Sequence, residues 1–484
     1  MKNSGFQFDN SYLNLPSPFY TKSNPIKVKS PKIVIFNEAL AIEMELNLLQ
    51  QSNKEKANLF SGNKLPIEAT PFSQAYAGHQ FGYFTVLGDG RAHILGEHVL
   101  SNGRRLDIQY KGSGRTPYSR SGDGRAVLGP MLREYIISEA MHALGIPTTR
   151  SLAVVTTGEN VIREQSLTGA VLTRVASSHI RVGTFEYSAM QGKKELTKTL
   201  LNYSINRHFP DIKNESNSTV LFLQNVINQQ IELIVHWMRV GFIHGVMNTD
   251  NMTISGETID YGPCAFMNTY DPNTVFSSID HMGRYAYSKQ PDIAQLNLAC
   301  LANTLLPFLS LDKDEAIKIA QDTINQFIPL YNNKWLNMMR SKLGLFGTQL
   351  NDEKLIFDLL DWMKTENADF TNTFYDLSYQ PEDVVNVYKS QSFTEWYKRW
   401  QKRLNQNQKN SVDSFQLMKQ NNPVIIPRNH NVEATLTAAE TGDLKPFNRF
   451  LNALKTPYEY NDCITDYQRP PSANERVYQT FCGT

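Results

Sequence analysis

The segment from residue 244 to residue 262 combines residue types that bind a divalent cation. It reads His-Gly-Val-Met-Asn-Thr-Asp-Asn over 244–251, continues through an apolar stretch, and ends in Asp-Tyr-Gly over 260–262. Asn251 and Asp260, separated by a predicted short β-hairpin, can converge on one Mg²⁺, which prefers oxygen ligands and keeps phosphate oxygens as partners. The alternative is a purely structural loop. We interpret His244 as a brace of this loop rather than a base or a ligand.

A lysine and a glutamate upstream form a second candidate pair. Lys111 falls on the polar face of a predicted strand, and Glu134 falls on a helix that begins near Pro130. A strand lysine held by a helix glutamate keeps an ammonium group directed at phosphate in protein kinases. The alternative is an exposed lysine and an unrelated surface glutamate.

Three glycine-rich turns are the third feature. They read LGDGR over 87–91, GSG over 112–114 and GDGR over 122–125. Glycines let backbone N–H groups approach phosphate closely, and neighbouring arginines donate forked hydrogen bonds to its oxygens. None of the turns matches the P-loop pattern GxxxxGK[ST]. Taken alone, each is more simply interpreted as an ordinary turn.

The order of these features resembles that of the protein kinases, whose catalytic loop and Asp-Phe-Gly segment hold the metal. The pattern departs from the kinases at one position. The kinase motif HRDxxxxN places its base five residues before the Asn, and Val246 occupies that position here. Valine cannot accept a proton, and the nearest carboxylate is Asp250. The sequence therefore predicts a kinase-like scaffold with altered phosphoryl-transfer machinery.

Short strands followed by helices must position these residues. Strands over 92–100 and 105–111 flank Asn102-Gly103, a dipeptide favoured in two-residue hairpin turns. An apolar stripe predicts a helix from Pro130 to Leu144, and helical spacing predicts another over 220–238. Further elements are predicted as a helix near 37–51 and strands around 152–155 and 170–175. This order predicts an α+β fold of two lobes with a ligand in the crevice between them.

We divide the chain into four predicted regions. They are an N-terminal extension (1–70), a strand-rich kinase-like N-lobe (71–180), a helical kinase-like C-lobe with the catalytic and metal-binding loops (181–345), and a C-terminal helical region with a cysteine-containing tail (346–484). Aromatic and basic residues alternate over 393–404 at helical spacing. We interpret them as a core-facing amphipathic helix rather than as an RNA-binding one.

Composition limits the classes of partner. The 484 residues contain 48 Lys and Arg against 47 Asp and Glu, and this near-zero balance argues against nucleic acid or an acidic membrane as a partner. No stretch reaches the ~18–20 apolar residues that cross a bilayer, and 296–311 is interpreted as a buried helix ending at Pro307. The first residues lack a secretory signal, and four cysteines are too few for a disulfide framework. We predict a cytoplasmic protein.

Longer motifs resemble one family. They are FSQAYAGHQFG at 72–82, LGDGRA at 87–92, YKGSGRTPYSRSGDGRAVLGPMLREY at 110–135, HGVMNTDNM at 244–252, DYGP at 260–263, and a cysteine third from the C-terminus. Together they are similar to the selenoprotein O family, whose bacterial members are called YdiU. The resemblance implies a pseudokinase fold that binds ATP in reversed orientation with Mg²⁺ or Mn²⁺. It also implies transfer of AMP to Ser, Thr or Tyr hydroxyls of proteins, and in some members use of UTP.

The resemblance also implies residue roles. Asn251 and Asp260 would bind the metal, Asp250 would accept the proton, and Glu134 would orient Lys111. The nucleotide, mostly its phosphates, would be held by Gly88, Gly90, Arg91, Lys111, Asp123, Gly124, Arg174, Arg181 and Asp260. Arg174 and Arg181 carry no signal of their own in the sequence, which otherwise marks them as surface residues.

The cysteines leave one question open. Cys482 lies in the C-terminal tail, where the resemblance suggests a redox role and, in some relatives, pairing with a cysteine near the metal-binding Asp. Cys264 is the candidate partner, but pairing requires Cα atoms within ~7 Å. We interpret Cys300 and Cys463 as small buried hydrophobic residues.

Three functions follow as hypotheses. The leading one is a metal-dependent protein adenylyltransferase that releases pyrophosphate, with UMP transfer from UTP as a further activity. The second is a conventional phosphotransferase in which Asp250 replaces the usual base. The third is a non-catalytic scaffold that binds nucleotide.

Overall fold

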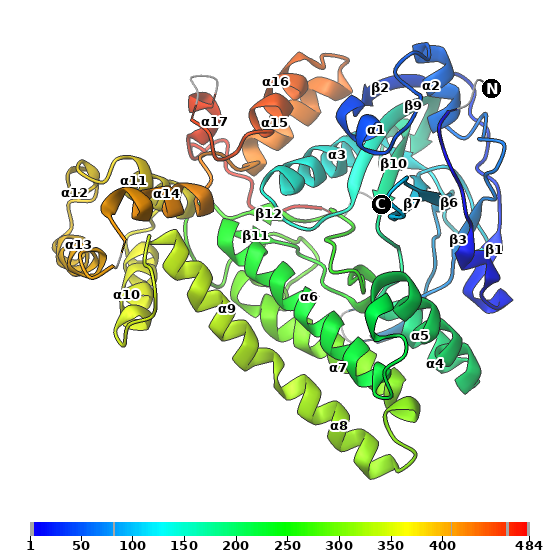
Figure 1. The fold of residues 1–484 in the computed structure, drawn as a ribbon. Coiled ribbons are helices and arrows are strands. Elements are labelled where there is room, and N and C mark those ends of the chain that lie inside the picture. Colours follow the sequence, from blue (N-terminus) through cyan, green and yellow to red (C-terminus); the bar gives the residue numbers. More distant parts are fainter. Residues whose placement is uncertain (1–3, 81–82, 408, 461–463, 482–484) are drawn as a thin grey trace.

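The computed structural model describes residues 4–80, 83–407, 409–460 and 464–481. Figure 1 shows the strands of the large sheet gathered at one side of the molecule and the long helices α6 to α9 beside them. The fold is α+β, with a strand-rich lobe followed by a helical lobe in the protein-kinase order, as predicted. The division into four regions stays a prediction.

One antiparallel sheet forms the strand-rich lobe. Its strand order is β1-β3-β6-β7-β10-β9-β2, with β8 beside β10. The strands are β1 (Tyr20–Lys22), β2 (Lys32–Phe36), β3 (Phe72–Gln74), β6 (Ala92–Val99), β7 (Arg105–Lys111), β8 (Ala126–Val127), β9 (Arg150–Ile162) and β10 (Ser166–Ala176). The predicted hairpin is confirmed, because β6 pairs with β7. Its turn is longer than the expected two residues, since the pairing ends at Val99 and Arg105, and of Asn102 and Gly103 only Gly103 has a positive φ, of 83°.

The strand β7 has two chemically different faces. Leu106, Ile108 and Tyr110 pack into an apolar core on one side of the sheet. Asp107 and Lys111 point to the other side, because successive side chains of a strand alternate. There α3 (Leu128–Ala143) covers the sheet and contacts β9 and β10. The predicted helix near Pro130 is thus confirmed, and it brings its side chains against the polar face of β7.

The predicted single helix over 37–51 is wrong. The structure has α1 (Glu38–Glu43) and α2 (Asn53–Phe60) instead. Glu45 adopts a positive φ of 57°, which ends the first helix. Ser52 and Glu55 then form a capping box, in which each side chain accepts a hydrogen bond from the other residue's backbone N–H, and this starts the second helix.

Six helices build the second lobe. They are α4 (Val182–Met190), α5 (Lys194–His208), α6 (Ser218–Val240), α7 (Gln290–Leu309), α8 (Lys313–Asn325) and α9 (Phe327–Lys342). The helix predicted over 220–238 is confirmed as α6. The helix predicted to end at Pro307 continues to Leu309, because a proline in the last turn removes only one backbone hydrogen bond.

Among the described residues, the segment Tyr287–Leu309 is the one helical stretch whose length and composition would suit a membrane span. Ile293, Leu298 and Leu301 on this helix are buried in the main core. The helix also packs against α4, α6 and α8. We therefore interpret α7 as a core helix.

Short elements frame the loops between the lobes. The strands β11 (Phe242–Ile243) and β12 (Ala265–Phe266) pair with each other, and β4 (Ala77–Gln80) pairs with β5 (Tyr83–Val86). The single-turn 3₁₀ helices are η1 (Ser11–Asn14), η2 (Ser17–Phe19), η3 (Pro210–Ile212), η4 (Thr249–Asn251) and η5 (Tyr287–Lys289).

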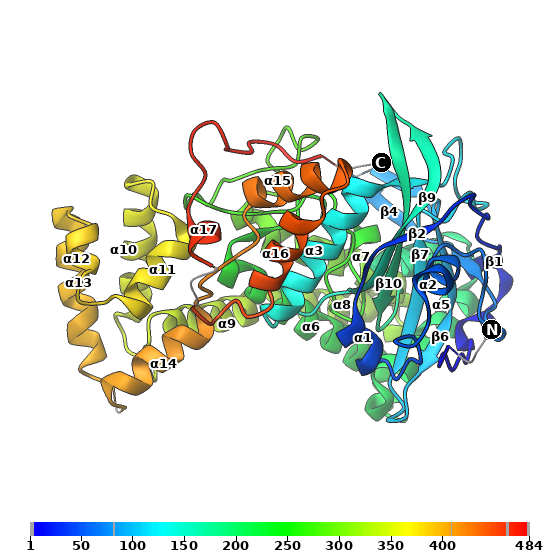
Figure 2. The same cartoon turned by 90° about the horizontal axis from the view of Figure 1, so that it is seen from above.

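The C-terminal region is helical. It contains α10 (Asp352–Thr365), α11 (Phe370–Tyr379), α12 (Val384–Val387), α13 (Gln391–Leu404), α14 (Ser411–Asn421), α15 (Asn429–Glu440), α16 (Lys445–Ala453) and α17 (Thr465–Gln468). Figure 2 shows α10 to α14 at the end of the molecule away from the sheet, whereas α15 and α16 lie beside α3. Phe393, Trp396 and Trp400 of α13 are buried, which confirms the amphipathic core helix.

The tail after α17 returns to the middle of the molecule. Thr480 pairs with Ser277 in a parallel bridge, and its N–H donates to the carbonyl of Phe276 at 2.7 Å. The Thr480 hydroxyl donates to the carbonyl of Pro263. The end of the chain is thereby fastened to the segment that follows Asp260.

Candidate active site

A cleft of about 640 Å³ lies where the sheet, α3 and the loops of the helical lobe meet. It is lined by the residues predicted to hold nucleotide and metal, together with the predicted base and the predicted partner of Lys111. These residues are Gly88, Gly90, Arg91, Lys111, Asp123, Gly124, Glu134, Arg174, Arg181, Asp250, Asn251 and Asp260. The structure thus brings together residues that are spread over more than a third of the chain. Their roles toward a ligand stay predictions.

An ion cluster occupies the inner part of this cleft. Lys111 Nζ lies 2.6 Å from Glu134 Oε2 and 2.8 Å from Asp260 Oδ1. Arg174 Nη1 lies 2.7 Å from the same Asp260 oxygen and 3.2 Å from Glu134 Oε1. Gln109 fixes this guanidinium, since its Oε1 accepts from Arg174 Nη2 at 2.6 Å. The predicted Lys–Glu pair is therefore formed, and Arg174 belongs to the same network.

Asp260 is held ionised and in an uncommon backbone conformation. Burial opposes its ionisation, but Arg174 and Lys111 outweigh this effect and lower its pKa well below the ordinary value. Its φ is 61°, in the left-handed region that Asp tolerates better than most residues. This combination fixes an anionic oxygen donor at the floor of the cleft.

The hairpin predicted between Asn251 and Asp260 is not formed. Thr253 pairs with Arg181 and Thr258 pairs with Thr148, so the backbone hydrogen bonds go to other segments. The turn is closed by Thr253 instead, whose hydroxyl donates to the Glu257 carbonyl at 2.8 Å and accepts from the Glu257 N–H at 3.1 Å. The segments around Arg181 and Thr148 therefore pair with the backbone groups that a hairpin would have paired with each other.

The loop before Asn251 is braced from inside. His244 Nε2 lies 2.9 Å from the Ile259 carbonyl oxygen, and burial lowers the pKa of His244, which agrees with a bracing role. The amide nitrogen of Asn251 donates to the Val246 carbonyl at 2.9 Å. This bond leaves Asn251 Oδ1 as the donor atom that the side chain offers to a cation.

Asp250 lies beside this loop, packed under the β4 strand. The His79 N–H donates to Thr249 Oγ1 at 2.8 Å, and a Cβ on Gly78 would overlap the Asp250 carboxylate. Glycine at 78 is therefore required for the close approach of β4 to the loop. Asp250 is 9% exposed and lines the cleft.

Arg181 brings a third cation into the cleft. It is only 1% exposed, and its guanidinium carbon lies 4.3 Å from the centre of the Tyr76 ring. Its Nη2 is 3.9 Å from Asp89 Oδ1 and 3.8 Å from Asp260 Oδ2. Among the described residues, its Nε has no hydrogen-bond partner. A buried guanidinium with unused donor capacity suits an anionic ligand.

Sequence reasoning missed Tyr76 and Asp89. Both line the cleft beside Arg181, and the Gln74 N–H donates to Asp89 Oδ2 at 3.0 Å. Burial raises the pKa of Asp89, and Arg181 opposes that rise. Their positions in the sequence could have indicated a role in the site, because Asp89 stands between Gly88 and Gly90 and Tyr76 stands within the 72–82 motif.

The glycine turns pack against each other at the outer edge. Gly124 has a φ of 68°, and a Cβ there would overlap the backbone of Gly114. Asp123 in the same turn is engaged by Arg163, whose Nη1 lies 2.8 Å from Asp123 Oδ2, and this contact lowers the Asp123 pKa. The tight turns are therefore structural as well as part of the cleft lining.

The cysteines behave differently from one another. Cys264 is fully buried, and burial raises its pKa to about 11. Cys463 and Cys482 lie outside the described residues, so the pairing of Cys264 with Cys482 stays a prediction. The interpretation of Cys300 as a small buried hydrophobic residue is confirmed in part, because Cys300 packs against the main core but is only half-buried. Its Sγ also lies 4.0 Å from His79 Nδ1.

Known proteins resemble this chain over nearly its whole length. The family model for "Protein adenylyltransferase SelO" matches residues 3–455. A relative from Nitrosococcus oceani, called "Protein nucleotidyltransferase YdiU", is 57% identical over 481 residues, which cover 99% of this chain and 98% of the relative. A relative of the same name from Clostridium botulinum is 56% identical over 483 residues, with the same coverage.

A solved structure was also found. It is ROP2 from Toxoplasma gondii, described as a virulence factor with a protein-kinase fold and no enzymatic activity. The match covers 70% of this chain and 88% of that one, with 8% identity and a TM-score of 0.26. A likeness this slight carries no argument about function.

Proposed function

The chain belongs to the SelO family and is a nucleotidyltransferase, and from this premise we propose that it transfers AMP from ATP to Ser, Thr or Tyr hydroxyls of protein substrates. Pyrophosphate is the second product. UMP transfer from UTP is proposed as a further activity of the same site, and the cytoplasm as its location. The observation that carries the proposal is the group of three buried cations, Lys111, Arg174 and Arg181, deep in a cleft that Asp250 also lines.

The buried cations support a reversed nucleotide. Lys111 and Arg174 share the carboxylates of Glu134 and Asp260, and the nearest carboxylate oxygens lie 3.8–3.9 Å from Arg181. A deep pocket lined with ammonium and guanidinium groups suits phosphates better than an adenine ring. Arg181 in particular has donor capacity that phosphate oxygens would use. With the β- and γ-phosphates held there, the α-phosphate lies toward the loop that carries Asp250.

The donor set of the loops fits a hard divalent cation. Asn251 Oδ1 and the Asp260 carboxylate would hold Mg²⁺ or Mn²⁺, which prefer oxygen ligands and share them with phosphates. When bound, such an ion neutralises charge on the reacting phosphate. The low pKa of Asp260 keeps its carboxylate available as a ligand at neutral pH.

The chain's own residues then move the proton and stabilise the leaving group. Asp250 takes the proton from the acceptor hydroxyl, and the oxygen of that hydroxyl forms a bond to the α-phosphorus. The bond between the α-phosphorus and the bridging oxygen breaks, and pyrophosphate leaves with the electron pair. Lys111 and Arg181 stabilise the negative charge that develops on it, as fixed donors directed at the leaving group. Val246 offers only its carbonyl, which already binds Asn251.

Labelled nucleotides test this proposal. The protein is incubated with Mg²⁺ or Mn²⁺ and a cell extract, with ATP labelled at either the α- or the γ-phosphate. We expect protein-bound label from the α-position only, and the same from α-labelled UTP for the further activity. Label retained from the γ-position alone would establish a conventional kinase, and no retained label with intact nucleotide binding would establish a scaffold. The matched control is Asp250→Asn, which should retain neither label.

A further inference from the structure

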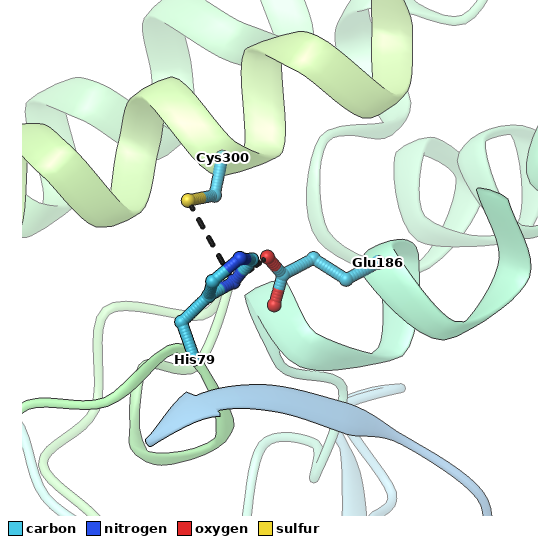
Figure 3. A group of neighbouring side chains, drawn as sticks. All are labelled: His79, Glu186 and Cys300. Atoms are coloured by element: carbon cyan, nitrogen blue, oxygen red, sulfur yellow. Dashed lines mark hydrogen bonds and ion pairs between the residues drawn. The ribbon is translucent and has the colours of Figure 1, made fainter. Parts of the chain in front are cut away.

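Three side chains with metal-binding atoms meet outside the nucleotide cleft. Figure 3 shows His79, Glu186 and Cys300 directed at one another. His79 Nδ1 lies 2.5 Å from Glu186 Oε1 and 4.0 Å from Cys300 Sγ, and the ligand atoms of the three all lie within 4.8 Å of one another. They come from β4, α4 and α7, so the fold itself, rather than local sequence, assembles them.

The surroundings favour a ligand at this point. Glu186 is 6% exposed, and within the part of the chain that the structure describes its Oε2 has no hydrogen-bond partner. A buried carboxylate oxygen without a partner is costly unless something binds it. A cavity of about 540 Å³, lined by Phe84, Met190 and Leu296 among others, opens onto the three side chains and gives access from solvent.

We propose that His79, Glu186 and Cys300 form a binding site for Zn²⁺ or a similar divalent transition metal. Imidazole nitrogen, carboxylate oxygen and thiolate sulfur are the three ligand types that Zn²⁺ uses. Thiolate disfavours Mg²⁺, so the site differs in chemistry from the Asn251 and Asp260 pair. Three protein ligands leave a fourth position, which a water molecule from the cavity would fill.

The contacts match a site before metal enters. His79 and Glu186 are closer than two ligands of one Zn²⁺, which stand about 3–4 Å apart at bond lengths of about 2.0–2.3 Å. The short contact is instead that of a hydrogen bond, whose proton the metal would displace. Cys300 must also lose its proton to bind the metal as a thiolate. Metal binding therefore releases protons and strengthens as the pH rises.

The site would connect the lobes beside the proposed base. His79 binds the metal through its side chain while its backbone N–H donates to Thr249, the neighbour of Asp250. A metal joining β4 to α4 and α7 would thus fix the strand that packs on the catalytic loop. This role does not depend on which nucleotide fragment the enzyme transfers.

Cobalt substitution tests the site without any activity measurement. The protein is freed of metal with a chelator, placed in excess Mg²⁺ to fill oxygen-donor sites, and titrated with Co²⁺. We expect one equivalent to bind with a thiolate-to-cobalt charge-transfer band, and Zn²⁺ to remove the band by competition. Loss of even an outer-sphere partner lowers metal affinity by about 10–100-fold. Cys300→Ser should therefore lose the band and weaken binding at least that much.

Cys264→Ser is the matched control, since it removes another buried thiol outside the trio and should keep the band. Absence of the band in the unaltered protein would overturn the proposal. So would a band that survives Cys300→Ser or disappears in Cys264→Ser. If Cys300→Ser does not fold, Glu186→Gln takes its place in the titration. Full cobalt affinity in Glu186→Gln would then contradict the proposal.

Discussion

At the residue scale, Asp260 is the point on which the cations of the cleft converge. Lys111 and Arg174 both contact its Oδ1, and Arg181 lies 3.8 Å from its Oδ2. Glu134 gives Lys111 and Arg174 a second anionic partner. The cations therefore remain neutralised before nucleotide binds, and a phosphate has to share them with carboxylates that stay in place.

Lys111→Ala should weaken both nucleotide binding and transfer. A hydrogen bond to a charged group contributes about 1.5–3 kcal/mol, so we expect affinity to fall by about 10–100-fold. Calorimetric titration with a non-hydrolysable ATP analogue measures the affinity. Lys56→Ala is the control, because Lys56 is equally buried but lies over Phe36, away from the cleft. Unchanged affinity in Lys111→Ala would remove Lys111 from the phosphate site.

Asp250→Ala should separate binding from chemistry. A general base acts in the transition state, so its loss should lower the transfer rate by about 10²–10⁴-fold while nucleotide affinity changes little. The same titration and the α-label assay measure the two quantities. A parallel loss of affinity and transfer would mean that Asp250 serves chiefly as a metal ligand.

At the element scale, the β4–β5 hairpin lies against both η4 and α4. Gly183, in the first turn of α4, allows this approach, because a Cβ there would overlap the carbonyl oxygen of Ala77. The obstacle is backbone, which cannot rotate away. The position of the strand over Asp250 therefore depends on two glycines, 78 and 183, from different elements.

Gly183→Ala should displace β4 from the loop that carries Asp250. We expect a lower thermal midpoint and a transfer rate that falls more than nucleotide affinity does, since two of the three cations of the cleft, Lys111 and Arg174, lie on β7 and β10. Gly129→Ala in α3 is the control, because its Cβ would meet only the flexible end of Glu440. Equal effects of the two substitutions on transfer would show that β4 does not position the loop.

The turn between Asn251 and Asp260 contributes a pH dependence. Burial raises the pKa of Glu257 from 4.5 to about 7, against the hydrogen bonds that Ser177 donates to it. Between these two pH values the folded protein keeps a proton that the unfolded chain has released. The contribution of protonated Glu257 to the stability of the folded protein is therefore complete below pH 4.5 and disappears as the pH rises through 7.

Glu257→Gln should remove this dependence. Relative to the variant, the unaltered protein should lose free energy of unfolding on the order of 1–3 kcal/mol between about pH 5 and pH 8, because one pKa unit corresponds to about 1.4 kcal/mol. Urea unfolding at the two pH values measures it. The same change with pH in both proteins would contradict the assignment to Glu257.

Local sequence patterns predicted those elements whose formation depends on residues close together in the sequence. The β6–β7 hairpin follows from Asn102-Gly103, and the Lys111–Glu134 pair follows from strand alternation and a helix start. Asp89, Tyr76 and the surroundings of Cys300 were missed because their partners come from distant segments. Arg174 and Arg181 were placed only through the family resemblance, since neither an arginine on a strand nor one just before a helix carries a local sign of burial.

At the scale of the whole molecule, the C-terminal tail closes the chain onto its centre. Thr480 contacts the carbonyls of Phe276 and Pro263, and the Ser278 N–H donates to the Thr480 carbonyl at 2.9 Å. Ile279, the next residue, lines the cleft. Thr480 therefore supports a segment that borders the proposed active site, although helices intervene between the two in sequence.

Removal of residues 469–484 should loosen that segment. We expect faster amide hydrogen exchange at 276–281 and a lower transfer rate, because the parallel pairing with Thr480 is lost. Exchange followed by mass spectrometry measures the first effect. Full-length Cys482→Ser is the control that removes the thiol while keeping Thr480. Unchanged exchange at 276–281 after truncation would show that the tail does not hold this segment in solution.

The sheet has one further property at this scale. Both of its outermost strands, β1 and β2, come from the first 36 residues. They cover β3 on one side and β9 on the other, whose backbone groups would otherwise face solvent. A chain that lacks these residues would expose the edges of both β3 and β9. Exposed strand edges pair with strands from other copies of a protein. The first 36 residues therefore supply the pairing partners of β3 and β9.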